Sequence, residues 1–486
     1  MLSEETTSRR PSRIKSAAQY LSKPGIISLG GGLPSAEYFP FDEYSFKVPK
    51  LGHFSEEETH RDGQAITAGK YDLAEDKSLY DIAVAFNYGQ GHGAAQLLRW
   101  MVEHTEIVHA PKYADWQCTS TIGTTSALDM LFRMVGKPGT YFLSEDYTFS
   151  TAVEAAAPLG MKCEGVPVDL EGLLPDELDR ILTNWDPSTH EGAPKPTILY
   201  TVPSGQNPTG ATQGKERRHA LYAVAQKHDL MIFEDEPYFF LQMQRYVGQG
   251  KAPPPPPKSH EEFLSSLVPS YLSFDTDGRV IRLDSFSKVI APGSRVGWIT
   301  GPEQIVQHYT RHADVSTQGP SGFSQLALFK LLDEHWGHGG YLDWLVHIRM
   351  EYTRRRDVIL GASEKYLPQE LVTWDPPMAG MFFWVKVDWL KHPQADKMPM
   401  RDLEDQIWHK VIDNGTLILK GSWFRADQGR GGGGKDEGMF FRMTFAAAKE
   451  QDMDEAVRRF GEALRKEFGL AEHTNGANGQ ANGHAG

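Results

Sequence analysis

The sequence predicts an α/β protein with a large, mostly parallel sheet and a second, smaller α+β domain. Between residues 117 and 301, short apolar segments such as QCTSTIG and LMIFEDEP alternate with longer amphipathic segments such as GKERRHALYAVAQKHD. This alternation is typical of a parallel sheet covered by helices on both faces. The length of 486 residues, 40% of them hydrophobic, exceeds what one core normally contains and favours two domains.

The pattern changes after a long, charged helical stretch over residues 331–363. AGMFFWVKVD and EGMFFRMTFA have the composition of strands, and RDLEDQIWHKVIDNG and EQDMDEAVRRFGEALRKEFG have helical periodicity. We therefore expect a large domain over residues 88–345 and a small domain over residues 346–470. Residues 25–87 lack the alternation, and we expect them to pack with the small domain and to carry a lid over the site.

Four segments are expected to lie outside the two cores. Residues 1–24 should be a flexible N-terminal segment, and the small, polar residues 471–486 a disordered tail. APPPPPK, residues 252–258, should be an extended loop, and GRGGGGK, residues 429–435, a mobile one.

The charge balance favours a small-molecule partner. The formal net charge is −14, whereas binding to nucleic acid or to an anionic membrane needs a basic surface. No apolar run approaches the length of a membrane span. We expect a cytoplasmic protein without nucleic-acid or membrane partners.

The cysteines and histidines indicate neither disulfides nor a metal. Cys118 and Cys163 are the only cysteines and should be buried strand residues, which suits a reducing compartment. His335 and His338 have no third ligand at a metal-binding spacing, so no metal site is expected.

Polar residues that could take part in catalysis or binding lie where predicted strands end. Asn207 follows PTILYTVP, Asp235 ends LMIFED, and Ser285 and Lys288 follow RVIRLD. In open α/β sheets, ligands bind at the carboxyl ends of the strands. An isolated lysine at such a place would extend its ammonium into solvent, whereas a lysine in a desolvated pocket can act as a nucleophile or base.

Arg442 lies inside the apolar segment FFRMTFA. A buried arginine needs an acidic partner. That partner is either a structural Asp or Glu of the chain, or the carboxylate of a substrate, which guanidinium binds through two hydrogen bonds.

Four motifs resemble, in this order, landmarks of class I and II aminotransferases. They are TVPSGQNPTG, EDEPY, DSFSKVIAPGSRVGW and FFRMTFA, and the resemblance covers most of residues 25–465. The segment ISLGGGLPSAEYFPF narrows it to the fungal aromatic amino acid, 2-aminoadipate and kynurenine branch. The resemblance implies the pyridoxal-phosphate transferase fold type I, pyridoxal 5'-phosphate as cofactor, and a homodimer with shared active sites.

The resemblance also implies roles around the cofactor ring. Lys288 would bond to the aldehyde carbon, and Asp235 would face the ring nitrogen, because a carboxylate keeps that nitrogen protonated. Asn207 and Tyr238 would bind the ring's phenolic oxygen. Lys288, Asp235 and Tyr238 are thus the expected catalytic residues.

The phosphate would be bound by two segments. STIGTTSALDMLFRMV opens a helix with a glycine turn, and free N–H groups there favour an anion; Thr124 and Thr125 occupy that turn. Ser285, Ser287 and Arg295 surround Lys288 and supply hydroxyl and guanidinium donors.

The remaining expected contacts are also implied by the resemblance. Tyr147 would stack on the ring, and Tyr88 would reach the phosphate of the partner subunit. Arg442 would bind the α-carboxylate of the substrate with help from Asn207, and Gly32 would belong to a backbone lid.

The implied reaction is transfer of an amino group from phenylalanine, tyrosine or tryptophan to a 2-oxo acid such as 2-oxoglutarate, with 2-aminoadipate and kynurenine as further donors. A β-lyase or decarboxylase remains open, because the same cofactor supports those reactions. A non-catalytic ligand-binding protein is the second alternative.

Overall fold

The computed structural model describes residues 2–16, 20, 23–27, 29–30, 32–427 and 438–471. The predicted glycine-rich loop over residues 429–435 and all of the predicted tail except Ala471 lie outside the described residues. The predicted extended loop over residues 252–258 contains no helix or strand.

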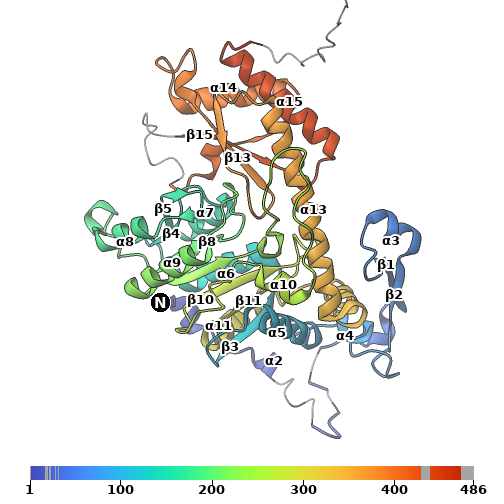
Figure 1. Cartoon of the computed structure of the whole chain (residues 1–486). Coiled ribbons are helices and arrows are strands. Elements are labelled where there is room, and N and C mark those ends of the chain that lie inside the picture. Colours follow the sequence, from blue (N-terminus) through green and yellow to red (C-terminus); the bar gives the residue numbers. More distant parts are fainter. Residues whose placement is uncertain are drawn as a thin grey trace, which may run out of the picture.

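The centre of the chain is a seven-stranded sheet (Figure 1). In spatial order its strands are β3 (Trp116–Thr121), β11 (Gly297–Pro302), β10 (Val280–Ser285), β9 (Met231–Asp235), β8 (Ile198–Thr201), β4 (Tyr141–Glu145) and β5 (Lys162–Val166). Strand β11 is antiparallel to both neighbours, and the pairs that join β10, β9, β8, β4 and β5 are parallel. The predicted mostly parallel sheet is confirmed.

Helices cover both faces of this sheet. They are α5 (Ala95–His109), α6 (Gly123–Val135), α7 (Ser150–Ala156), α8 (Pro175–Thr183), α9 (Lys215–His228), α10 (His260–Ser265), α11 (Glu303–Ala313) and α12 (Gly322–Phe329). Thr105 of α5 contacts Cys118 of β3, whereas Thr310 of α11 donates to Thr119 at 3.3 Å. Adjacent strand residues point to opposite faces, so α5 and α11 lie on opposite sides of the sheet.

A second sheet lies at the other end of the molecule (Figure 1). Its strands are β12 (Val372–Trp374), β13 (Phe382–Val387), β15 (Met439–Thr444) and β14 (Leu419–Lys420), and it is accompanied by α14 (Met400–Asp413) and α15 (Glu450–Glu467). The long helix α13 (Gly337–Tyr366) connects the two ends of the molecule.

We propose that residues 88–345 and 346–470 form the large and small domains. Two separate apolar clusters support this division, and α13 contributes Leu345 to the first and Leu360 to the second. The proposed boundary therefore falls within a continuous helix.

The predicted packing of residues 25–87 on the small domain is wrong for the hairpin in this segment. Strands β1 (Glu43–Val48) and β2 (Gln64–Gly69) enclose α3 (Glu56–Asp62), and the hairpin lies beside the lower end of α13 (Figure 1). Val48 and Ile66 belong to the apolar cluster of the large domain. The alternating burial of β2 gives it one apolar face, which packs near the π-helical turn Lys330–Trp336.

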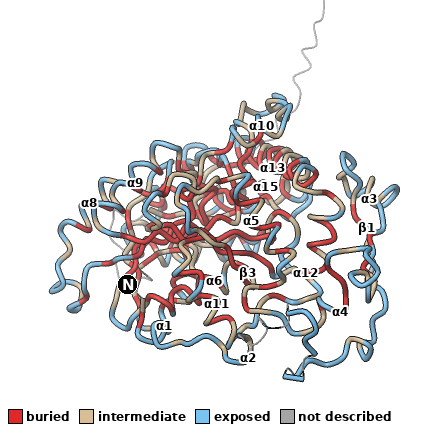
Figure 2. Tube along the Cα trace, turned by 90° about the horizontal axis from the view of Figure 1, so that it is seen from below, coloured by how far each residue is buried: buried red, intermediate tan, exposed pale blue. Residues whose placement is uncertain are grey.

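The predicted flexibility of residues 1–24 is also wrong for the first residues. Ser3 caps α1 (Glu4–Ser8), and the Ser3 N–H donates to the carbonyl of Met134 at 2.7 Å. Thr6 is buried. Figure 2 shows buried and exposed stretches alternating along this peripheral chain, with α1 next to α6 and α11.

Cys118 and Cys163 are buried residues of β3 and β5, as predicted, and they are not joined in a disulfide. Within the part of the chain that the structure describes, no helix is long and apolar enough to cross a membrane.

Candidate active site

A cavity of about 270 Å³ opens at the carboxyl ends of β8, β9 and β10. It brings together most of the predicted site residues from distant parts of the sequence. The lining residues are Thr124, Thr125, Phe149, Val202, Asn207, Asp235, Pro237, Tyr238, Ser287, Lys288, Pro292, Arg295 and Phe382.

Asp235 is a buried carboxylate with one oxygen left free. Strand β9 is buried along its whole length and carries Asp235 to the edge of the cavity. Oδ2 accepts a hydrogen bond from the hydroxyl of Tyr200 at 2.8 Å, while Oδ1 has no partner among the described residues. Burial raises the pKa of Asp235 to about 7, with the hydrogen bond from Tyr200 acting in the opposite direction. A protonated ring nitrogen would satisfy Oδ1.

Asp235 should make the stability of the cofactor-free protein depend on pH. Its folded pKa of about 7 lies above the ordinary value of 3.8, so the native state binds the proton more tightly. Stability is then highest below the ordinary pKa and decreases as the pH rises through both values, by roughly 4 kcal/mol at most. Urea unfolding of the cofactor-free wild type and of Asp235→Asn across this range should show the decrease only in the wild type. Parallel profiles would contradict this assignment.

Lys288 lies half-buried in the turn after β10 and lines the same cavity. Burial, and secondarily the charge of Arg295, lower the pKa of its ammonium. No described residue forms an ion pair or hydrogen bond with Nζ. A lysine amine in these surroundings is easier to deprotonate and is available to an electrophile.

An anion site lies where α6 begins. No side chain caps the N-terminus of α6, and the Arg295 guanidinium lies against it, with Nη2 donating to the carbonyl of Ile122 at 3.3 Å. Nη1 of Arg295 is 3.5 Å from the hydroxyl of Ser287. A guanidinium at the positive end of a helix dipole is unfavourable unless an anion lies between them. A phosphate fits this combination of charge and N–H donors.

Gly123 keeps this anion site open. It has φ +73°, and a Cβ there would lie 2.4 Å from Nη2 of Arg295. We expect Gly123→Ala to weaken cofactor binding by roughly 10- to 100-fold, because displacing the guanidinium loses a charge-assisted hydrogen bond. Gly139→Ala is the matched control, since Gly139 has φ +79° and open space around the Cβ position. Titration of both variants with cofactor tests this, and equal affinities would contradict it.

Arg442 of β15, in the small domain, is half-buried and does not line the cavity itself, but it contacts two of the lining residues. Its Nη1 donates to Oδ1 of Asn207 at 2.7 Å, and its guanidinium lies 4.3 Å from the ring centre of Phe382 and 4.6 Å from that of Phe424. Burial lowers its pKa to about 10, with the opposing influence of Tyr238 smaller. Residues 2–427 and 438–471, as far as described, provide no carboxylate partner. The structural-acid alternative for Arg442 thus receives no support there.

Tyr238 lines the cavity beside Arg442 and Asp235. It is buried, and burial raises the pKa of its hydroxyl. Tyr238 therefore remains protonated at neutral pH and can donate a hydrogen bond.

The predicted position of Tyr147 is wrong. Tyr147 lies outside the cavity, packed edge-on against Trp384 and Phe440 at ring distances of 5.5 and 5.2 Å. Phe149, two residues later, lines the cavity instead. The chain turns after β4 before α7 begins, and the sequence DYTF does not reveal which of its two aromatic residues faces inward.

Three other predicted residues lie away from the cavity lining. Ser285 donates to the hydroxyl of Ser287 at 2.8 Å and so supports the lining rather than forming it. Tyr88 is 71% exposed. Gly32 is exposed with no atom within 4 Å of its Cβ position, so the predicted lid does not cover the site within this chain.

Sequence reasoning missed Tyr200, Phe149, Gly123 and Phe382. A signal existed for Tyr200, because it is the polar-tipped residue of a fully buried strand next to β9. A signal also existed for Gly123, which precedes the two threonines in the glycine turn. Nothing in the sequence identified the two phenylalanines.

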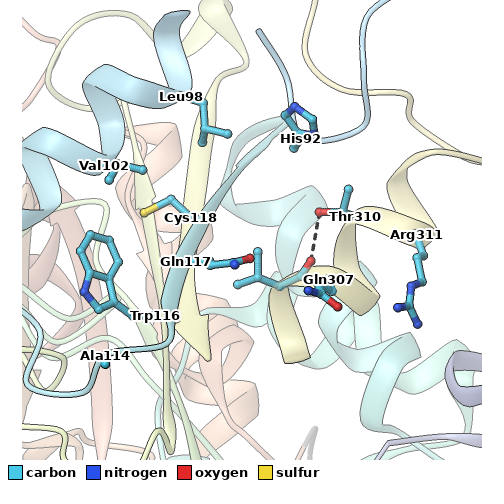
Figure 3. A pocket seen from close by; sticks show the side chains of 11 residues that line it. His92, Leu98, Val102, Ala114, Trp116, Gln117, Cys118, Gln307, Thr310 and Arg311 are labelled. Atoms are coloured by element: carbon cyan, nitrogen blue, oxygen red, sulfur yellow. Dashed lines mark hydrogen bonds between the residues drawn. The ribbon is translucent and has the colours of Figure 1, made fainter. Parts of the chain in front are cut away.

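A larger hollow of about 730 Å³ lies at the edge strand β3, between α5 and α11 (Figure 3). Its lining includes His92 and Cys118. Burial raises the pKa of Cys118 to about 12 and lowers that of His92, so neither is charged at neutral pH. No carboxylate and no lysine is among the residues that line this hollow.

The cavity residues define a pyridoxal-phosphate enzyme. The free oxygen of Asp235 fits the ring nitrogen, the start of α6 with Arg295 fits the phosphate, and the Lys288 amine fits the aldehyde. Three comparisons with known proteins agree with this class.

The family model described as aminotransferase class I and II matches residues 65–460. An aromatic amino acid aminotransferase of Schizosaccharomyces pombe is 42% identical over 96% of this chain and 97% of its own length. An L-tyrosine:2-oxoglutarate aminotransferase of Serpula lacrymans is 35% identical over 87% of this chain and 82% of its own length. The crystal structure of the aminotransferase Aro8 from Candida albicans superposes with a TM-score of 0.88, 39% identity, and coverage of 96% and 98% of the two chains.

The chain therefore belongs to the class I and II aminotransferases. It is a pyridoxal-phosphate-dependent aminotransferase of fold type I, as the sequence predicted.

Proposed function

We propose that this enzyme transfers the amino group of an aromatic amino acid to 2-oxoglutarate. The observation that carries the proposal is Arg442, a half-buried guanidinium without an acidic partner in the described residues. It contacts Asn207 and Phe382, which line the cavity together with Lys288 and Asp235. Phe382 and Phe424 flank the guanidinium, and Phe149 lines the cavity, so an aromatic side chain has apolar surface nearby. The names of the relatives above point to the same substrates.

Each residue of the cavity has a distinct proposed role. Asp235 keeps the ring nitrogen protonated, and the bound cofactor then supplies an electron sink for the bond broken at the substrate α-carbon. Lys288, as a free amine, would remove the proton from the substrate α-carbon. Arg442 holds the α-carboxylate, which fixes the α-hydrogen toward Lys288.

Two hydrogen-bonding groups support these roles. Tyr238 donates to the phenolic oxygen of the ring, with the amide of Asn207 beside it. Asn207 also orients Arg442 through the 2.7 Å hydrogen bond. The first turn of α6, Ser287 and Arg295 hold the phosphate, and Ser285 orients Ser287.

We propose a homodimer with shared active sites. The N-terminal part exposes large apolar side chains, including Leu29 at 96%, Ile27 at 88%, Tyr38 at 77% and Tyr88 at 71%. Exposed apolar surface of this extent indicates a protein partner. Light scattering of the purified protein should give twice the chain mass, and a monomer would contradict the proposal. The two buried cysteines, which form no disulfide with each other, support a cytoplasmic location.

A panel of amino donors with 2-oxoglutarate tests the substrate proposal. Phenylalanine, tyrosine and tryptophan should give higher kcat/KM values than alanine and aspartate, with glutamate as the common product. Release of ammonia or carbon dioxide would instead indicate the β-lyase or decarboxylase alternative. A preference for aspartate would overturn the aromatic assignment.

A further inference from the structure

A second cavity, of about 720 Å³, lies between the two domains next to the active site. Three segments of the chain line both cavities. In each segment, the residue that lines the second cavity is two positions from the residue that lines the active-site cavity. The pairs are Phe149 and Tyr147, Asn207 and Thr209, and Phe382 and Trp384. The two cavities therefore share the same pieces of chain.

The floor of the second cavity is the open face of the small sheet. Along β13 and β15, every second residue is buried in the small-domain core, and the residues between them point toward the large domain. This face carries Trp384 and Phe440, whose rings stack at 5.0 Å with an angle of 11° between their planes. Tyr147 from the large domain closes the aromatic surface edge-on.

An unpaired cation and an unpaired carboxylate lie at the edges of this aromatic surface. Lys386 of β13 is opposite Thr373 of β12 in the sheet, and Asp375 is two residues after Thr373 in the sequence. Both side chains are exposed, and neither has an ion pair or a hydrogen bond within the described ranges. The Lys386 ammonium lies over the ring of Phe440, 6.0 Å from its centre. By contrast, Asp169 of the cavity lining forms an ion pair with Arg217 at 2.8 Å.

The combination is complementary to one class of ligand. A flat apolar ring fits the Trp384 and Phe440 surface, a carboxylate fits Lys386, and an ammonium fits Asp375. We propose that this cavity is a regulatory site for a free aromatic amino acid, separate from the active site. The ligand is not transaminated there, because Lys288 lines the other cavity.

Occupancy of this cavity should be linked to the active site. The loop that carries Asn207 and Thr209 packs directly on the small domain, since a Cβ on Gly205 would lie 2.4 Å from the carbonyl carbon of Ala379. A ligand that contacts both domains stabilises one position of the small domain relative to the large domain. That position affects the contact between Gly205 and Ala379 and the hydrogen bond between Arg442 and Asn207. Linkage then requires that substrate and regulatory ligand change each other's affinity.

Binding of radiolabelled L-phenylalanine to the enzyme loaded with pyridoxamine phosphate tests the proposal. An amine cannot condense with the amino form of the cofactor, so equilibrium dialysis measures binding without turnover. The pocket variant is Asp375→Asn with Lys386→Ala. Its matched control is Asp396→Asn with Lys397→Ala, a neighbouring exposed pair outside the cavity.

The wild type and the control should bind one more equivalent of phenylalanine per chain than the pocket variant. Equal stoichiometry and affinity in all three proteins would overturn the proposal. The result does not depend on phenylalanine being a substrate. If phenylalanine does not enter the active site, all three proteins bind one equivalent less, and the difference between them stays the same. All exchanged side chains are exposed, so the variants should fold.

Discussion

Replacing Lys288 with alanine should abolish transamination while leaving the fold intact. The side chain lines the active-site cavity, has a lowered pKa and has no partner among the described residues, so no structural contact depends on it. Loss of a positioned base alone costs roughly 10²- to 10⁴-fold in rate, and loss of the bond to the cofactor adds to this.

Single-turnover measurements with phenylalanine should show this loss in Lys288→Ala. The bound cofactor should also lose the absorption band that depends on its bond to the lysine. Lys112→Ala is a suitable control, because Lys112 is exposed and outside the cavity. A Lys288→Ala protein that retains wild-type rates would rule out Lys288 as the base.

Replacing Arg442 with leucine should reduce kcat/KM by roughly 10²- to 10³-fold, because the substrate carboxylate loses a charge-assisted, two-point contact in a desolvated site. The effect should appear mainly in KM. Arg442→Lys keeps the charge but cannot bind both carboxylate oxygens in the same plane, so its kcat/KM should lie between those of wild type and Arg442→Leu.

The absorption spectrum distinguishes a substrate contact from a structural role for Arg442. The cofactor band should persist in both Arg442 variants, since the guanidinium has no hydrogen bond to Asp235 or Lys288. Loss of its hydrogen bond to Asn207 should at most shift the band. Loss of the cofactor band would show that Arg442 maintains the cofactor site or the fold.

Much of the fold was predictable because its elements are long and regular in pattern. The strands from β3 to β11 appear in the sequence as apolar segments between amphipathic helices, and Asp235 and Ser285 end theirs as predicted. The N-terminal part was not predictable in the same way. Its short strands β1 and β2 are exposed on one face, and their packing partner lies about 270 residues later in the chain, near Lys330–Trp336.

In the candidate site, residues next to strands were also predictable, whereas residues of short loops and exposed segments were not. Lys288, Asp235 and Asn207 follow strands, and parallel strands bring their carboxyl ends together, so their clustering was predictable. Tyr147 and Phe149 differ only in which way a short loop turns, and local sequence does not determine this. Gly32 and Tyr88 lie on exposed segments, and a single chain does not provide what covers them.

A half reaction without an acceptor tests directly whether this enzyme transfers an amino group to its cofactor. Purified enzyme loaded with pyridoxal phosphate is mixed with L-phenylalanine, and the cofactor absorption and the products are measured. We expect a single loss of the visible to near-ultraviolet band and phenylpyruvate equal in amount to the bound cofactor, with recovery of the band on adding 2-oxoglutarate. Continued product formation without an acceptor, with release of ammonia or carbon dioxide, would contradict this expectation.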